Sequence, residues 1–482
     1  MITLARTHAR PPSQPPERFR SKFPTHLSGG PVNAPLPRRA GSRVLSPTKV
    51  IALSFLVAIV IGTLLLWLPW SHAPGQIITP LDALFTATSA LCVTGLVVVD
   101  TETAWSTLGR VVLMLLIQIG GLGIVTLGTL VALLLGRRVG FQERLRAAAQ
   151  VSALGTGGVL RLVRTIFLIS LGFETVGATL LYPTFAALHG PGQGLFYAFF
   201  HSVSAFNNAG FALYSDSLIR FVDDPVVTLV LSALFIFGGL GFIVHLNVWA
   251  NLRGRRRFPL TLHSRVVLLA TLLLCTLGAL TVLALEWNNP QTLQPLPWHA
   301  KLLAGFFQGV TPRTAGFNSL DYTLLYEPTL LVTMLLMFVG GSPASTAGGI
   351  KTVTFFVLVA SAWSMVRGRG ELSAFGRRVS VETVVKAGSV ALLSTGIVMS
   401  ALFLLSVTES LPLLTVMFEA FSAFSTVGLS LNATFELSDP GRLIIVLLMY
   451  LGRIGPLTFA LALVQSPRDT RLKYPDEGVL IG

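Results

Sequence analysis

The chain has 482 residues, of which 52% are hydrophobic and only 12% are charged, about half the charged share of a typical soluble protein. This composition argues against a soluble enzyme or binding domain and predicts a protein that faces lipid. The formal net charge of +14 does not indicate a nucleic-acid partner, because the basic residues cluster on alternate connections between apolar segments, which is typical of the cytoplasmic loops of membrane proteins.

The first 46 residues are rich in Pro, Arg and Ser and show no apolar periodicity. We expect 1–46 to be a basic cytoplasmic tail without a packed core. The two cysteines, Cys92 and Cys275, lie in apolar stretches and have neither a disulfide framework nor metal-ligand spacing. The arginine clusters that follow residues 136, 252 and 366 place three connections and both termini in the cytoplasm.

Eight apolar stretches follow the tail, each of about 20 residues or more, which is the length that crosses a bilayer. They lie at 49–70, 108–135, 160–182, 226–250, 263–286, 328–365, 383–408 and 441–464. Four shorter apolar stretches separate the members of successive pairs, at 80–94, 194–209, 298–315 and 412–427. A stretch of about 15 residues is too short to cross, so these four are predicted to be re-entrant pore helices.

Two glycine markers recur in step along the chain. The first ends each short stretch and recurs after 115, 106 and 112 residues, at Gly95, Gly210, Gly316 and Gly428. The second follows it by 25, 28, 24 and 24 residues, at Gly120, Gly238, Gly340 and Gly452. Such internal periodicity indicates a repeated unit. We predict an all-α integral membrane protein with four tandem helix–pore helix–helix repeats, eight spans and four re-entrant loops around one pseudo-fourfold pore.

The predicted repeats occupy 47–136, 137–252, 253–367 and 368–465, and a short cytoplasmic tail follows at 466–482. Non-helical backbone at membrane depth is tolerated only inside protein or along a water-filled cavity, so the four turns are expected to share one axis. A ring of carbonyls there can replace the hydration shell of a cation. The predicted filter consists of Val93, Thr94, Gly95, Asn208, Ala209, Gly210, Thr314, Ala315, Gly316, Thr426, Val427 and Gly428. For any single glycine, a plain turn or a close helix contact is the alternative.

The third repeat departs from the others, because glycine, proline and small hydroxyl residues interrupt its second span. A continuous helix tolerates such a segment poorly, so we expect a non-helical gating loop below the filter, or else an ordinary helix break at a packing interface. The predicted loop consists of Gly340, Gly341, Ser342, Pro343, Ala344, Ser345, Thr346, Ala347, Gly348, Gly349 and Lys351.

Charged residues at membrane depth are costly and usually functional. Arg453 stands where the other repeats carry the second glycine of their marker; we expect a barrier to cations that holds the loop, or a structural arginine bonded to backbone carbonyls. Asp100, Asp216 and Asp321 follow the filter turns and are predicted to attract cations at the outer mouth, with ordinary loop or helix-cap carboxylates as the alternative. Glu174 and Glu419 mark either an ion path or a scaffold. His201 and His245 are interpreted as structural histidines.

These residues resemble the Ktr/Trk/HKT superfamily of potassium transporters over residues 47–465. The glycines Gly95, Gly210, Gly316 and Gly428 match its filter glycines, segment 340–351 matches its intramembrane gating loop, and Arg453 matches the arginine of its last helix. The chain is similar to the KtrB-type membrane subunit more than to the TrkH type, because the basic first 46 residues cannot supply the extra N-terminal spans of the latter. Gly95 stands where sodium-permeable plant relatives carry serine.

The resemblance implies potassium-selective uptake across the cell inner (cytoplasmic) membrane by a homodimer embedded in lipid. It also implies a cytoplasmic ring of KtrA-like RCK subunits, with the nucleotide (ATP or ADP) on that partner, no cofactor in this chain, and potassium, or alternatively sodium, as the ion in the pore. The alternatives are a Trk-type potassium/sodium transporter and another secondary transporter with a midplane site. The chain carries no enzyme motif that we recognise, so no catalytic activity is expected.

Overall fold

The computed structural model describes residues 47–123, 159–252, 260–368, 371–456 and 458. These residues all belong to one contact unit, 45–482. The predicted tails at 1–46 and 466–482 lie outside the described residues, as do the arginine clusters that begin at 137 and 253. The inner half of the predicted span 108–135 also lies outside them.

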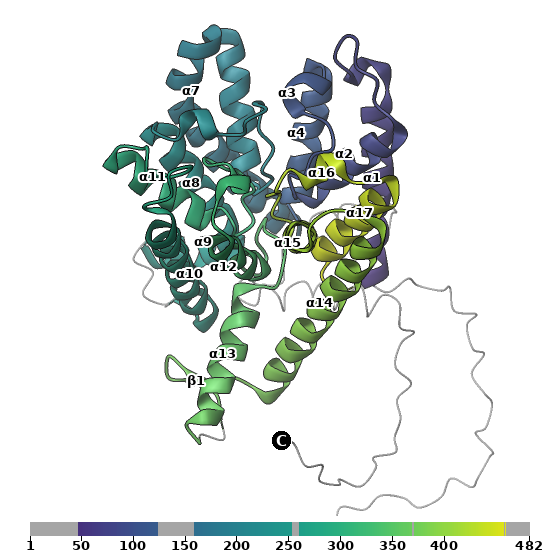
Figure 1. The fold of residues 1–482 in the computed structure, drawn as a ribbon. Helices are drawn as coiled ribbons and strands as arrows, with labels where there is room; N and C mark the ends of the chain where they lie inside the picture. Colours follow the sequence, from purple (N-terminus) through teal and green to yellow (C-terminus); the bar gives the residue numbers. More distant parts are fainter. Residues whose placement is uncertain (1–46, 124–158, 253–259, 369–370, 457, 459–482) are drawn as a thin grey trace, which may run out of the picture. The chain divides into compact units, whose positions relative to one another are not determined.

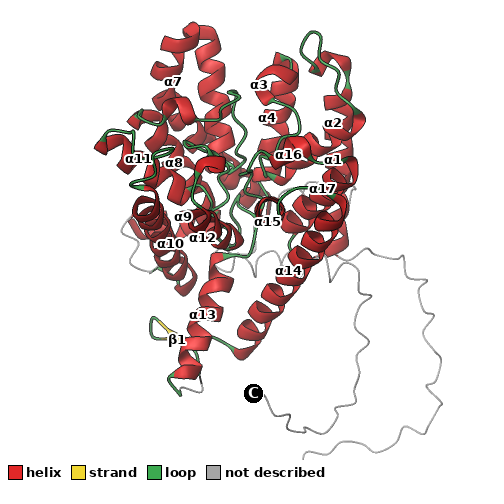
Figure 2. Cartoon of the chain, viewed as in Figure 1, coloured by secondary structure: helices red, strands yellow, loops and turns green. Residues whose placement is uncertain are grey.

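The described chain is almost entirely helical (Figure 2). The first predicted repeat contains α1 (Pro47–Trp67), η1 (Pro69–Ser71), α2 (Pro80–Cys92), α3 (Thr101–Ala104) and α4 (Thr107–Gly121). The second contains α7 (Val159–Phe206), η2 (Ile219–Phe221), α8 (Pro225–Leu240) and α9 (Phe242–Leu252). The third contains α10 (Leu262–Glu286), α11 (Trp298–Val310), η3 (Tyr322–Leu324), α12 (Glu327–Phe338) and α13 (Thr352–Val366). The fourth contains β1 (Ser373–Ala374), β2 (Arg377–Arg378), α14 (Val381–Thr408), α15 (Leu413–Ser425), α16 (Ala433–Glu436) and α17 (Asp439–Ile454). The short strands β1 and β2 pair antiparallel.

Four described helices, α1, α7, α10 and α14, are long and apolar enough to cross a membrane, or five spans if α8 and α9 count as one bent span. The remaining predicted spans are represented by shorter apolar helices, α4, α12 and α13, and by α17. The total of eight spans therefore stays a prediction. Large apolar side chains stand exposed along the long helices, for example Leu272 on α10 and Leu392 on α14, as expected for surfaces that face lipid.

Two predicted elements differ from the structure. The span 226–250 is bent by 98° between α8 and α9, at Gly241, whose φ is +90°. The stretches 160–182 and 194–209 are joined by helical residues within α7, and the only non-helical residue is Gly190, with φ 78° and ψ 169°. Pro191 follows this kink, and proline suits the first turn of the helix that begins there.

Glycines with a positive φ follow the second helices of three predicted repeats at corresponding positions. Gly123, Gly241 and Gly455 each lie three residues after the first glycine of the second marker, and their φ values are 90°, 90° and 89°. The third predicted repeat has Pro343 at this position. A proline cannot adopt a positive φ, so the second helix of this repeat cannot be followed by the same turn. In the third repeat, α12 ends at Phe338.

Contacts between the predicted repeats close into a ring, and Figure 1 shows α17, near the end of the described chain, beside α2, near its start. The second helix of each one packs against the pore helix of the next: α4 against α7, α8 against α11, α12 against α15, and α17 against α2. Bulky side chains of the pore helices are fully buried, including Phe85, Phe206, Phe307 and Phe418. The pore helices thus form the interior, and the long helices cover them.

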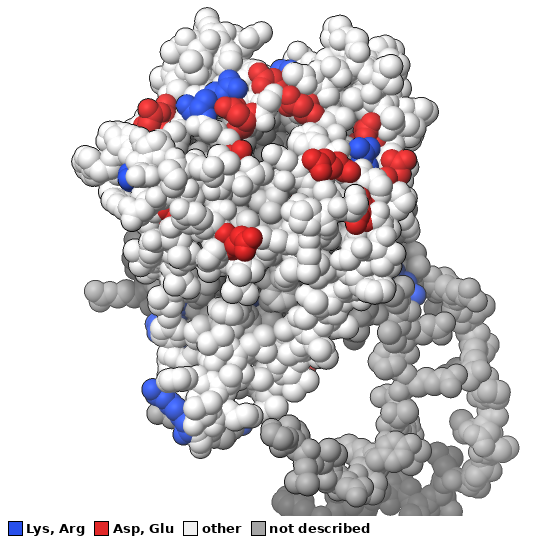
Figure 3. Space-filling model, in the orientation of Figure 1, with Lys and Arg blue, Asp and Glu red and all other residues white. Residues whose placement is uncertain are grey.

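Charge separates along the described molecule. Figure 3 shows acidic residues, with some basic ones among them, gathered toward one end of the viewed face and basic residues near the other end. The wide zone between them is almost free of charge on this face. An uncharged belt between two polar ends matches the expectation for a chain that crosses a membrane.

Candidate functional site

The four pore helices end in the same backbone geometry. Two residues before each glycine, a residue other than glycine adopts a left-handed conformation: φ is 58° at Val93, 59° at Asn208, 71° at Thr314 and 50° at Thr426. Such residues are uncommon. The glycines themselves also have positive φ, at 93°, 71°, 79° and 94°. The repeated sequence marker therefore corresponds to a repeated turn.

Hydroxyl side chains fix these turns in two ways. In the first and fourth turns, the Oγ atoms of Ser89 and Ser422 accept hydrogen bonds from the amides of Gly95 and Gly428, both at 3.1 Å. In the second and third turns, Ser204 and Thr311 instead donate to the carbonyls of Phe211 and Phe317. The turns are thus set by local bonds that span six or seven residues.

The four glycines meet around one closed ring. A Cβ atom built on Gly95 would lie 2.4 Å from the carbonyl oxygen of Ala209, and one on Gly428 would lie 2.1 Å from that of Thr94. The corresponding atom on Gly316 would lie 2.3 Å from the oxygen of Val427, and that on Gly210 would lie 2.9 Å from the Cα of Gly316. Each turn therefore touches its neighbours, and no side chain fits at any of the four positions.

The predicted gating loop is non-helical between α12 and α13, over residues 339–351. The loop packs against the bend between α8 and α9. There, the amide of Ser342 donates to the carbonyl of Gly239 (3.0 Å), and the amide of Phe242 donates to the carbonyl of Ala344 (3.1 Å). It also touches two filter turns. Thr346 Oγ1 donates to Asn208 Oδ1 at 2.8 Å, and a Cβ atom on Gly348 would lie 2.0 Å from Thr426 Oγ1.

Arg453 holds this loop against the first repeat. Its guanidinium donates from Nη1 to the carbonyl of Thr346 and from Nη2 to the carbonyl of Gly120 at the end of α4. The residue is only 5% exposed. The arginine therefore bonds backbone carbonyls, one of which belongs to the loop, and its role as a barrier to cations stays a prediction. Lys351 closes the loop from within, where its Nζ donates to the carbonyl of Ala347 at 2.7 Å.

The three outer carboxylates have local partners. Asp100 accepts from the amide of Glu102 (2.9 Å) and caps α3, and Asp321 accepts from the amide of Thr323 (2.9 Å) and caps η3. Asp216 forms an ion pair with Arg220 at 2.8 Å, and this hydrogen-bonded contact raises the pKa of the Arg220 guanidinium. The loop or cap alternative therefore describes the local geometry, with caps at Asp100 and Asp321 and an ion pair at Asp216. The role at the mouth stays a prediction.

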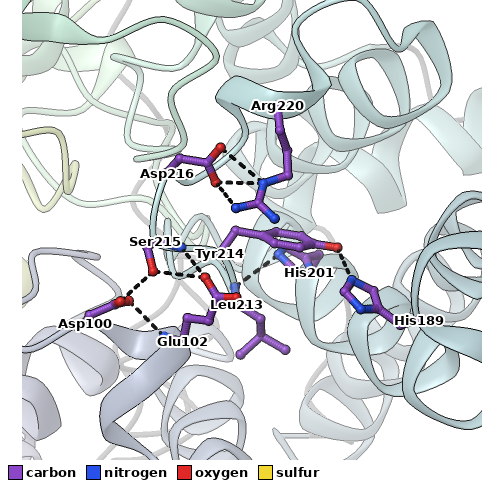
Figure 4. Close-up of polar contacts among 9 residues, drawn as sticks. All are labelled: Asp100, Glu102, His189, His201, Leu213, Tyr214, Ser215, Asp216 and Arg220. Atoms are coloured by element: carbon purple, nitrogen blue, oxygen red, sulfur yellow. Dashed lines mark hydrogen bonds and ion pairs between the residues drawn. The ribbon is translucent and has the colours of Figure 1, made fainter.

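Figure 4 shows how the outer segments of the first two predicted repeats are joined. Ser215 Oγ contacts the carboxylates of both Asp100 and Glu102. Behind them, His201 accepts a hydrogen bond from the amide of Leu213 at 3.2 Å and contacts the carbonyl of Tyr197, which confirms its interpretation as a structural histidine. His245 likewise contacts a carbonyl, that of Phe237.

Several buried polar residues near the turns were not singled out from the sequence. Asn207 donates to Gln118 (2.9 Å) and to Glu174 (3.1 Å), so Glu174 is part of a scaffold between α4 and α7. Glu419 accepts from Ser430 at 2.8 Å in the same supporting manner. Arg313 was also not singled out from the sequence. The signal that could have marked it is a lone arginine inside a pore turn.

These features define a mostly helical, polytopic membrane protein whose short helices converge on four glycine turns. The chain belongs to the TrkH family, described as "Cation transport protein", whose profile matches residues 37–474. It is 44% identical to "Ktr system potassium uptake protein B" of Bacillus subtilis, over 91% of this chain and 97% of that protein. It is 37% identical to "Potassium/sodium uptake protein NtpJ" of Enterococcus hirae, over 91% of this chain and 98% of that protein.

The fold is also that of a solved relative. The crystal structure of the potassium transporter TrkH from Vibrio parahaemolyticus matches 89% of this chain and 87% of its own, with a TM-score of 0.68 and 19% sequence identity. The predicted membership in the superfamily is confirmed, as is the similarity to KtrB-type subunits, since a second one, from Vibrio alginolyticus, is 43% identical over 90% of this chain.

Proposed function

We propose that this chain mediates potassium uptake across the cytoplasmic membrane through the ring of four glycine turns. The single observation that carries the proposal is the closed ring, in which Gly95, Gly210, Gly316 and Gly428 each approach the backbone of the next turn. The names of the similar proteins, which specify potassium uptake, support it.

The chemistry of the ring suits a monovalent cation. The positive φ of the left-handed residue and of the glycine in each turn allows consecutive carbonyls to face a common axis, where they would replace the water lost by the ion. The C-terminal ends of the pore helices point the negative ends of their dipoles at the ring. The proposed filter comprises the triplets 93–95, 208–210, 314–316 and 426–428, with the carboxylates of Asp100, Asp216 and Asp321 raising the local cation concentration outside it.

The loop 340–351 is proposed to obstruct the path on the inner side of the ring. Its contacts with Asn208 and Thr426 place it beside two of the four turns. Arg453 adds a positive charge there and ties the loop to α4 through Gly120. A gate of this kind opens when a competing interaction releases the loop, because its two states need to differ by only a few hydrogen bonds.

Regulation is proposed to come from outside the chain. We assign it to a cytoplasmic ring of KtrA-like RCK subunits that binds ATP or ADP, acting on a membrane homodimer with both termini in the cytoplasm. The "Ktr system" names of the relatives support a multi-subunit assembly. The name of NtpJ favours sodium as a second ion, and this alternative predicts measurable sodium flux through the same ring.

Growth and flux measurements together test the proposal. A bacterium that lacks its potassium-uptake systems should grow at low potassium when it expresses this chain with a KtrA-type partner. Purified protein in proteoliposomes should accumulate potassium in preference to sodium. The matched control is Gly388→Ser on α14, where a Cβ atom meets nothing within 4 Å, and it should behave as the wild type. No rescue and no potassium flux from protein that inserts normally would refute the proposal.

A further inference from the structure

A second buried arginine lies directly behind the ring. Arg313 precedes the filter residue Thr314, and it is only 7% exposed. Among the described residues, no carboxylate lies within 4.0 Å of its guanidinium. A buried charge without a counter-ion is costly unless its donors are hydrogen-bonded. The hydrogen-bond partners of Arg313 therefore indicate its role.

Those partners come from two elements outside the pore turn. Nη1 approaches the carbonyl of Thr271 and Sγ of Cys275, both on α10 and both at 3.4 Å. Nη2 approaches the carbonyl of Gly340, also at 3.4 Å. Gly340 is the first residue of the gating loop and follows the C-terminal end of α12, where partial negative charge favours a cation. Arg313 therefore spans the third turn, α10 and the start of the loop.

The donor set of Arg313 is incomplete. Its Nε has no partner, and neither does the hydroxyl of Thr271. A cavity of about 10 Å³ is lined by Arg313, Thr271, Cys275, Val310 of α11 and residues of α8. This is about the smallest cavity that holds one water molecule, which needs two or more polar partners to be stable in a protein interior. The unpartnered Nε and hydroxyl belong to two of the lining residues and would supply two such partners.

We propose that Arg313 is a positioning residue that fastens the third filter turn to the start of the gating loop, with one buried water bridging it to Thr271. The proposal rests on the function proposed above. It gives the loop two arginine attachments: Arg313 at Gly340 and Arg453 at Thr346. The planar fork of arginine presents donors from separate nitrogens in a fixed geometry, whereas a lysine presents its donors from a single nitrogen. Filter shape and loop position are thereby linked through one side chain.

Flux through proteoliposomes containing the full chain tests this link. Arg313→Gln removes the charge and most donors, so the potassium-to-sodium flux ratio should fall about tenfold, as expected for the loss of hydrogen bonds to a charged group, and basal flux should rise. Arg313→Lys should fall between the glutamine variant and the wild type. Thr271→Val, which removes only one partner of the water, should show a smaller change in the same direction. Arg367→Gln, an exposed arginine at the end of α13, is the matched control and should change nothing.

The outcomes separate the two proposals. Absence of potassium flux in the wild type would refute the proposed function and not the role of Arg313. Potassium flux in the wild type, with an unchanged ion ratio and basal flux in a normally inserted Arg313→Gln variant, would overturn the positioning role. If the glutamine variant fails to insert, Arg313→Lys decides, and wild-type behaviour of that variant overturns the role. A high-resolution density map should show a single peak within hydrogen-bond distance of Arg313 Nε and Thr271 Oγ1, and an empty cavity would overturn the bridging water.

Discussion

The ring of turns and the loop beside it are built on opposite principles. Each turn is fixed by bonds between near neighbours in the sequence, such as Ser89 to Gly95. The loop is fixed by residues far away along the chain: Thr346 bonds Asn208 and Arg453, which lie 138 and 107 positions away. Local bonds specify a geometry that can be repeated four times, whereas distant bonds specify a position that can be released. This contrast suits a permanent filter and a movable gate.

The largest effect is expected from substitutions that disrupt the ring of turns itself. Gly316→Ser or Gly95→Ser places a Cβ atom within 2.4 Å of a neighbouring carbonyl oxygen and forces a left-handed conformation on serine. Strain of about 1–3 kcal/mol at one backbone position should lower the potassium-to-sodium flux ratio by about 5- to 140-fold. Flux ratios in proteoliposomes measure this, with Gly388→Ser as the control. An unchanged ratio in both variants would count against the filter assignment.

Removing the loop is expected to have the next largest effect. Deletion of residues 342–349 takes away the segment that touches Asn208 and Thr426 while leaving the turns and their local bonds intact. Basal potassium flux should rise severalfold, and the ion ratio should change less than in the glycine variants. The comparison of flux with and without the regulatory partner provides the measurement. If the deletion lowers flux in protein that inserts normally, the loop supports the pore and does not obstruct it.

Releasing the loop without deleting it should have a smaller effect of the same sign. Arg453→Gln loses charge-assisted bonds to the carbonyls of Thr346 and Gly120, each of which contributes about 1.5–3 kcal/mol when the donor is charged. Basal flux should increase, to a level below that of the deletion. Membrane content and thermal stability of the variant serve as controls. Wild-type basal flux would leave Arg453 with a structural role alone.

The smallest effect is expected from the loss of one hydroxyl between the filter and the gate. Thr346→Val keeps the shape of the side chain but removes the hydroxyl, which donates to Asn208 Oδ1 at 2.8 Å and approaches the carbonyl of Phe206 at 3.3 Å. A neutral hydrogen bond contributes about 0.5–1.5 kcal/mol, so basal flux should rise about two- to tenfold with no change in the ion ratio. Single-turnover or initial-rate flux measurements resolve such a difference. A change in the ratio without a change in basal flux would mean that this bond shapes the filter.

The turns were predictable because their information is local and repeated. Gly95, Gly210, Gly316 and Gly428 recur with the second marker at nearly constant intervals, and a backbone turn needs little else. The break before α13 was predictable for a related reason, since Gly340 and Pro343 lie in one short segment that disfavours helix. These signals depend on residue type and spacing, which a sequence displays directly.

The features that could not be predicted from the sequence depend on contacts between repeats. The bend at Gly241 was not predicted, because that glycine was counted only as part of a repeated marker; the loop carbonyl of Pro343 would lie 2.7 Å from its Cβ. The caps at Asp100 and Asp321 were foreseen only as an alternative to a role at the mouth, because helices as short as α3 and η3 leave little pattern in the sequence. Arg313 was passed over, because its meaning comes from Gly340 and α10, which only folding brings to it.

The most direct test of a single central pathway is to locate the bound ion in a crystal. Thallium resembles potassium in size and charge and scatters anomalously, so crystals of the protein soaked in thallium should show a peak on the axis between the four turns, near the carbonyls of Thr94, Ala209, Ala315 and Val427. Gly316→Ser should weaken that peak while leaving the fold intact. Thallium bound only away from the ring, in protein that still transports potassium, would contradict the account.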